Sequence, residues 1–153
     1  MFLRSLARHA NRPSLLRPML LDASKLQIEK TTTPKPKLPN DQLVFGKTFT
    51  DHMLEVEWTK ENGWGAPKIL PYHNILLDPS AVVFHYAFEL FEGMKAYRDA
   101  NNQIRTFRPE KNMDRMNKLA ERIALPTFDG EELAKCIDKL VLLDQDFVPQ
   151  GAG

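Results

Sequence analysis

The stretch FRPEKNMDRMNKLAERI, residues 107–123, is the segment from which the fold of the chain is best predicted. Pro109 suits the first turn of a helix, where its missing N–H costs nothing. Apolar side chains then recur at three- and four-residue steps, at Met113, Met116, Ala120 and Ile123. Pro126 is expected to end the helix, because proline cannot continue the hydrogen-bond ladder. The stretch therefore predicts one amphipathic helix.

A second helix is expected directly after the first. Asp129 with Glu132 three residues later follows the capping-box pattern, with Asp in place of Ser or Thr. One apolar stripe follows it, formed by Leu133, Cys136, Ile137, Leu140 and Val141. Cys136 is predicted to be a buried small hydrophobic side chain. It is the only cysteine, which excludes an internal disulfide and a cysteine-rich zinc site.

Towards the N-terminus the pattern changes from helical to strand-like. Four segments are predicted strands: residues 53–59, 68–77, 94–98 and 104–107. Residues 62–65 and 99–102 have the composition of turns. Residues 80–90 are ambiguous, and the pattern favours a short helix with Ser80 as its N-cap. Because all four predicted strands precede the long helices along the chain, the sequence indicates an α+β fold.

The first 21 residues hold four arginines and no acid. Arg4, Arg8 and Arg12 repeat every four residues, so a helix would place them on one face. An arginine-rich, acid-free start is typical of a mitochondrial transit peptide, and residues 1–25 are predicted to form one. A secretory signal is disfavoured because the arginines interrupt the apolar stretch. A basic tail without a targeting role is the remaining alternative.

Residues 26–40 contain three prolines within six positions and predict an extended linker or arm. The folded domain is then expected to cover residues 41–153, beginning near Asp41.

The longest apolar run is four residues, against ~20 for a membrane-spanning helix, so no membrane partner is predicted. After the basic start, 17 lysines and arginines face all 20 acids. This balance argues against a nucleic-acid partner, because phosphate contacts need a basic face.

No common nucleotide-binding, hydrolase or zinc-protease motif is present, and the four histidines lack metal-ligand spacing. Two segments nevertheless stand out. Residues 85–97 gather aromatic side chains, acids and a lysine around Gly93, which suits an apolar pocket with a polar rim. Residues 105–116 place arginines beside the first turns of the predicted helix, where an anion is favoured.

Three motifs in the same order resemble one known enzyme family. LVFGKTFTDHML (residues 43–54), LFEGMKAY (90–97) and FRPEKNMDRM (107–116) are similar to the N-terminal domain of branched-chain amino-acid aminotransferases, a likeness that covers about residues 41–153. The resemblance implies a fold type IV enzyme that uses pyridoxal 5'-phosphate and forms homodimers. It would move the amino group of L-leucine, L-isoleucine or L-valine to 2-oxoglutarate. The basic N-terminus agrees with a mitochondrial member.

The resemblance also gives four residues candidate roles. Arg115 matches the position whose guanidinium holds the cofactor phosphate. Phe45 and Phe91 match positions in the substrate side-chain pocket, and Tyr86 matches a tyrosine offered to the pocket of the neighbouring subunit. Lys95 does not match a position that the family uses for the cofactor, and is expected to be solvated.

The family's cofactor-binding lysine is expected beyond Gly153, so the chain as given is expected to be an inactive N-terminal portion. Two alternatives stay open. One is another fold type IV enzyme, such as a D-amino-acid transaminase or an aminodeoxychorismate lyase. The residues of the motifs FEGMKAY (91–97) and NMDRM (112–116) disfavour this alternative. The other is a non-catalytic short form that acts as a binding or dimer-poisoning module.

Overall fold

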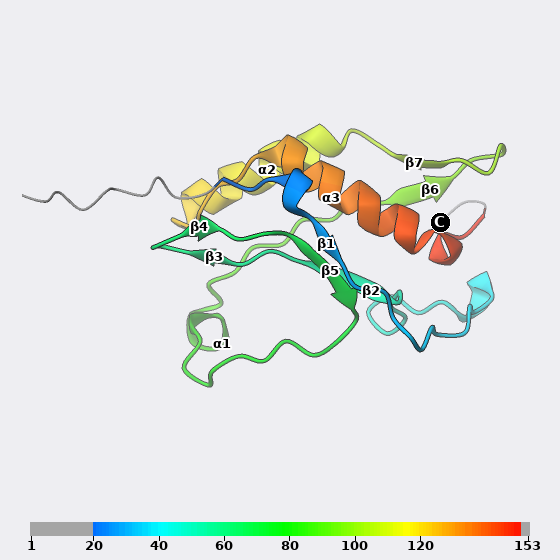
Figure 1. The fold of residues 1–153 in the computed structure, drawn as a ribbon, viewed down its shortest axis with the longest axis horizontal. Coiled ribbons are helices and arrows are strands. Elements are labelled where there is room, and N and C mark those ends of the chain that lie inside the picture. The colour runs from blue at the N-terminus through cyan, green and yellow to red at the C-terminus, as the bar shows by residue number, and fades with distance from the viewer. Residues whose placement is uncertain (1–19, 151–153) are drawn as a thin grey trace, which may run out of the picture.

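The computed structural model describes residues 20–150, so most of the predicted transit peptide lies outside the described residues (Figure 1). The described part is α+β, as predicted. Its strands are β1 (Gln27–Ile28), β2 (His52–Glu55), β3 (Trp58–Thr59), β4 (Gly63–Trp64), β5 (Lys68–Pro71), β6 (Ala96–Arg98) and β7 (Ile104–Thr106). Its helices are α1 (Val82–Tyr86), α2 (Pro109–Arg122) and α3 (Gly130–Leu143), with 3-10 turns η1 (Ala23–Lys25), η2 (Asn40–Gln42) and η3 (Gln145–Phe147).

The core lies between a small sheet and the two long helices. The sheet has the order β1-β5-β2, with β5 parallel to β1 and antiparallel to β2. Helix α3 packs against β2 on one side and against α2 on the other, as the layers of Figure 1 show. Ile69 of β5 and Cys136 of α3 are fully buried in this core. The predicted burial of Cys136 is therefore confirmed.

Both helices begin where the sequence places them, but their ends and caps differ in detail. Helix α2 starts at Pro109 and ends at Arg122, before Pro126, because Ala124 takes a left-handed conformation with φ of 56° and turns the chain away. Asp129 caps α3 by accepting hydrogen bonds from the amides of Glu131 and Glu132. The second hydrogen bond of a capping box, from the Asp129 amide to the Glu132 carboxylate, is not formed, so this part of the prediction is wrong. The Glu132 carboxylate instead accepts from the Ala23 amide at 2.7 Å.

The hairpin predicted around residues 99–102 is present as β6 and β7. The strand predicted over 53–59 is divided into β2 and β3, and β3 forms a second small hairpin with β4. The turn predicted at 62–65 falls instead at 60–62, since Gly63 already pairs with Thr59.

Two predictions around α1 are corrected. The strand predicted over residues 68–77 stops at Pro71, and the chain then leaves the sheet. A short helix does follow, but Ser80 does not cap it. The Ser80 hydroxyl donates to Asp78 at 2.6 Å, which closes a local turn, and Ala81 occupies the N-cap position. Helix α1 and its flanking segments project away from the α2 and α3 layer in Figure 1.

The segment expected as a linker or arm packs on the body as an arm. The Gln27 amide donates to the Pro67 carbonyl and the Glu29 amide to the Ile69 carbonyl, both at 2.9 Å. Leu21 is buried as well. The folded part therefore begins before Asp41, because backbone donors that the prolines do not remove are free to pair with the edge of β5.

Within residues 20–150, no helix is long and apolar enough to cross a lipid bilayer. In the same range, no three histidine, cysteine, aspartate or glutamate side chains gather closely enough to hold a metal ion.

Candidate functional site

Two of the three motifs meet at the carboxylate of Glu92. This residue lies in the segment between α1 and β6, and it faces Asn112 and Arg115, which share one face of α2 because they are three residues apart. Arg115 Nε donates to Glu92 Oε2 at 2.6 Å, and Arg115 Nη2 also binds Glu92 Oε1. Asn112 Nδ2 donates to Glu92 Oε1 and to the Gly93 carbonyl, both at 2.9 Å. The tertiary fold therefore joins residues 90–97 to residues 107–116.

The carboxylate of Glu92 is held strongly in its ionised form. Besides the bonds from Arg115 and Asn112, its Oε1 accepts a hydrogen bond from the Gly93 amide at 2.9 Å. These donors, Arg115 foremost and then Asn112, lower the pKa of Glu92 to about 2 against the opposing effect of desolvation. The same pair raises the pKa of Arg115. The site is thus a fixed ion pair at ordinary pH.

One edge of the Arg115 guanidinium is not engaged by Glu92. Glu92 binds it from the side, through Nε and Nη2. The two Nη1 hydrogens and the second Nη2 hydrogen have no partner among residues 20–150, and 63% of the side chain is exposed. A guanidinium presents five donors in a planar fork, and its end is well shaped to bind two oxygens of a phosphate or carboxylate. Arg115 can therefore hold an anion on its solvent side.

The three aromatic candidates lie on the surface of this chain. Phe45 is fully exposed in the loop after η2, Tyr86 is the last residue of α1, and Phe91 directly precedes Glu92. Among residues 20–150, no ring contact links any two of them. Of these three, only Phe91 is adjacent in sequence to the Glu92 and Arg115 pair. The structure therefore exposes these side chains without bringing them into one pocket.

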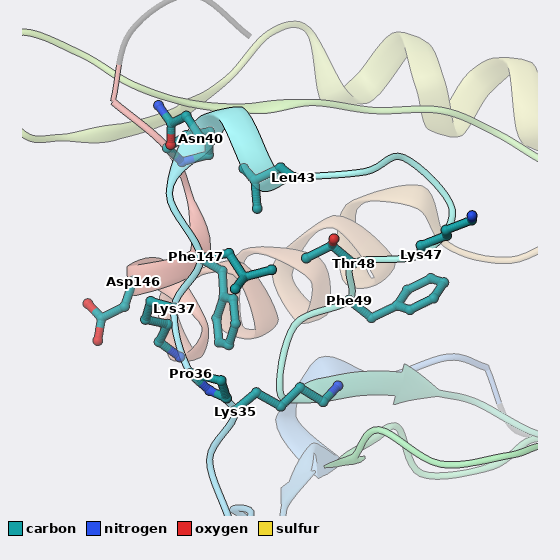
Figure 2. A pocket seen from close by; sticks show the side chains of 12 residues that line it. Lys35, Pro36, Lys37, Asn40, Leu43, Lys47, Thr48, Phe49, Asp146 and Phe147 are labelled. Carbon is teal, nitrogen blue, oxygen red and sulfur yellow. The ribbon is translucent and has the colours of Figure 1, made fainter.

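A cavity of about 330 Å³ lies beside the loop that carries Phe45 (Figure 2). The arm, the loop over residues 43–49 and η3 form its walls, and Phe147 is one of the side chains that line it. Lys37 Nζ lies 3.1 Å from the centroid of the Phe147 ring and 3.3 Å from Asp51 Oδ2. Lys35 Nζ donates to the Thr50 carbonyl at 2.6 Å. The cavity is formed by segments that are more than 100 residues apart in the sequence. No local sequence pattern could therefore predict it.

Sequence reasoning missed Glu92 and Asn112 as members of the site. Both stand inside the quoted motifs, and the spacing of Asn112 and Arg115 places them on one helix face. That Glu92 is their shared partner depends on where the segment before β6 crosses α2. This crossing is a tertiary feature.

No family model matches the chain. Curated proteins do match it. It is 63% identical over 133 residues to a yeast protein named "Branched-chain-amino-acid aminotransferase, cytosolic" and 61% identical over 133 residues to the "Branched-chain-amino-acid aminotransferase, mitochondrial" of the same yeast, Saccharomyces cerevisiae. A protein of Monosiga brevicollis named "Branched-chain-amino-acid aminotransferase" is 53% identical over 141 residues.

These matches cover 87%, 87% and 92% of this chain, but 35%, 34% and 36% of the three relatives. The chain therefore spans about a third of the length of the curated relatives it matches. Over the matched residues, this chain is similar to proteins named as branched-chain-amino-acid aminotransferases.

Proposed function

We propose that this chain supplies the small α+β portion of a branched-chain-amino-acid aminotransferase. The enzyme would move the amino group of L-leucine, L-isoleucine or L-valine to 2-oxoglutarate. The observation that carries this proposal is the 63% identity over 133 residues to a relative with that name. The order of the three motifs supports it, and two of the motifs contact each other through Glu92.

The proposed cofactor is pyridoxal 5'-phosphate, which stabilises negative charge at the reacting carbon of an amino acid when it is bound. Within this chain, Arg115 would bind the cofactor phosphate. The fit is chemical: the free end of its guanidinium offers paired N–H donors to an anion, while Glu92 occupies the other edge. Arg115 would thereby orient the phosphate and neutralise part of its charge.

Three exposed aromatic side chains are proposed to serve the substrate. Phe45 and Phe91 would exclude water from the aliphatic side chain of a branched amino acid, because burial of apolar surface is what distinguishes such substrates from polar ones. Tyr86 would serve the pocket of a second subunit in a homodimer. Their exposure in this chain supports a role at a surface that another part of the assembly covers.

A mitochondrial location is proposed from the arginine pattern of residues 1–21. Similarity to relatives does not distinguish the two locations, because this chain is 63% identical to the cytosolic yeast protein and 61% identical to the mitochondrial one. A fusion of residues 1–30 to a fluorescent protein should enter mitochondria. The same fusion with Arg4, Arg8, Arg12 and Arg17 changed to glutamine should stay in the cytosol, and import of both fusions would contradict the proposal.

The activity is tested on native protein captured from the source organism with antibodies raised against the chain. Captured material should form glutamate from L-leucine and 2-oxoglutarate, and material from pre-immune serum should not. Activity with D-alanine in place of L-leucine would indicate a different fold type IV enzyme. Captured protein that contains this sequence but transaminates neither substrate would favour the non-catalytic binding module.

A further inference from the structure

The ion pair between Glu92 and Arg115 is asymmetric in its burial. The Glu92 side chain is 6% exposed, whereas the Arg115 side chain is 63% exposed. Glu92 also has two anchors of its own, the Asn112 amide and the Gly93 N–H. The carboxylate is therefore the fixed member of the pair, and the guanidinium is the member presented to solvent.

The direction of the contact determines which donors remain. A carboxylate that binds Nε and Nη2 leaves the Nη1 and Nη2 end of the fork available, and it restricts rotation of the guanidinium plane. An arginine without this contact would sample many rotamers at a site of this exposure. A surface ion pair between two mobile side chains would not produce this restriction.

We propose that Glu92 is a positioning residue for Arg115: it binds the side of the guanidinium so that the Nη1 and Nη2 end faces an anionic group, with Asn112 holding Glu92 in place. This inference rests on the proposed function, in which that anion is the cofactor phosphate. Glu92 itself touches neither the anion nor the reacting atoms.

Charge and orientation make opposite predictions for the loss of Glu92. Its negative charge repels a nearby anion, so charge alone predicts that Glu92→Gln would bind an anion more tightly. Orientation predicts weaker binding, because the guanidinium loses a charged, two-point contact. The sign of the change in affinity therefore separates the two effects.

The test uses inorganic phosphate and the ¹⁵N-labelled chain at constant ionic strength, with the Arg115 Nε–H resonance as the readout. In the wild type, this group should show little fast motion and its resonance should shift as phosphate is added. Glu92→Gln should increase its motion and weaken phosphate binding by about tenfold. Glu89→Gln removes the same charge three residues away and should change affinity by less than about twofold.

Phosphate binding by Glu92→Gln that equals or exceeds that of the wild type would overturn the inference. Asn112→Ala provides an independent variant in case Glu92→Gln does not fold, because it removes the anchor and keeps both charges. It should also weaken phosphate binding, and unchanged binding in it would count against the inference. Arg115→Gln identifies the site, because it removes the charge and the guanidinium fork together: phosphate binding that survives in Arg115→Gln would contradict the proposed cofactor role itself.

Discussion

His52 and Asp144 form a buried hydrogen bond that joins strand β2 to the C-terminal end of helix α3. His52 Nδ1 donates to Asp144 Oδ1 at 2.6 Å, and the His52 backbone amide donates to Oδ2 at 2.9 Å. On the other side of the ring, Nε2 accepts from the Thr31 amide at 2.9 Å. This arrangement requires a neutral ring with its proton on Nδ1, and it connects the arm, the sheet and α3 through one side chain.

Replacing His52 should therefore destabilise the fold. His52→Ala leaves a buried carboxylate and the Thr31 amide short of partners, and should lower the free energy of unfolding by about 2–4 kcal/mol. Urea denaturation followed by circular dichroism measures this change. His73→Ala is the matched control, because His73 pairs with Glu55 at a half-exposed site and should cost less than about 1 kcal/mol. Equal losses in the two variants would contradict the structural role of His52.

The low pKa of Glu92 predicts a specific loss of stability in acid. Its pKa is about 2 in the folded chain against an ordinary value of 4.5, so between these values the unfolded chain binds more protons than the folded chain. The stabilisation is complete above pH 4.5 and should be lost as the pH falls towards 2. The stability difference between wild type and Glu92→Gln, measured by urea denaturation, should shrink over this window. A stability difference between the two proteins that stays constant from pH 6 to pH 3 would contradict the low pKa of Glu92.

Gly130 permits close contact between α2 and α3. A Cβ at this position would lie 2.7 Å from Met113 Cβ, a distance that side chains do not tolerate. Gly130→Ala should force the helices apart and lower the midpoint of urea unfolding, at a cost of about 1–3 kcal/mol. At Gly93, a Cβ would meet no atom within 4 Å, so Gly93→Ala should have a much smaller effect.

Cys136 should be chemically inert in the folded chain. It is fully buried, and burial raises the pKa of its thiol, so little thiolate is available to react. A disulfide reagent such as 5,5'-dithiobis(2-nitrobenzoate) should react at least about 100-fold more slowly with the native chain than with the chain in urea. Reaction at similar rates in both states would show that α3 opens readily.

Local patterns were sufficient for the elements whose determinants lie within a few residues. Pro109 at the first helical position, Asp129 at the N-cap and the turn before β7 each act through neighbouring backbone groups, and each element is present as predicted. Ser80 shows the limit of this reasoning. As an N-cap its oxygen would accept a hydrogen bond from a backbone amide, but its hydroxyl instead donates to Asp78, and Ala81 precedes α1.

For the candidate site, the resemblance of residues 107–116 was sufficient to select Arg115 as a candidate anion-binding residue. Its partner Glu92 lies 23 residues away, and only the packing of the segment before β6 against α2 brings the two together. The exposure of Phe45, Tyr86 and Phe91 likewise depends on which surfaces the rest of the chain covers.

The sequence by itself determined the α+β order of elements, the two long helices with their starting residues, and the resemblance that the curated relatives support. Periodicity, proline and caps act over one or two turns, so they can be recognised in a linear string. The tertiary structure alone decided that the proline-containing arm joins the sheet, that His52 pairs with Asp144, and that Glu92 orients one edge of Arg115. These contacts join residues from 23 to 92 positions apart, and they form only where packing of the core brings distant polar groups within hydrogen-bonding distance.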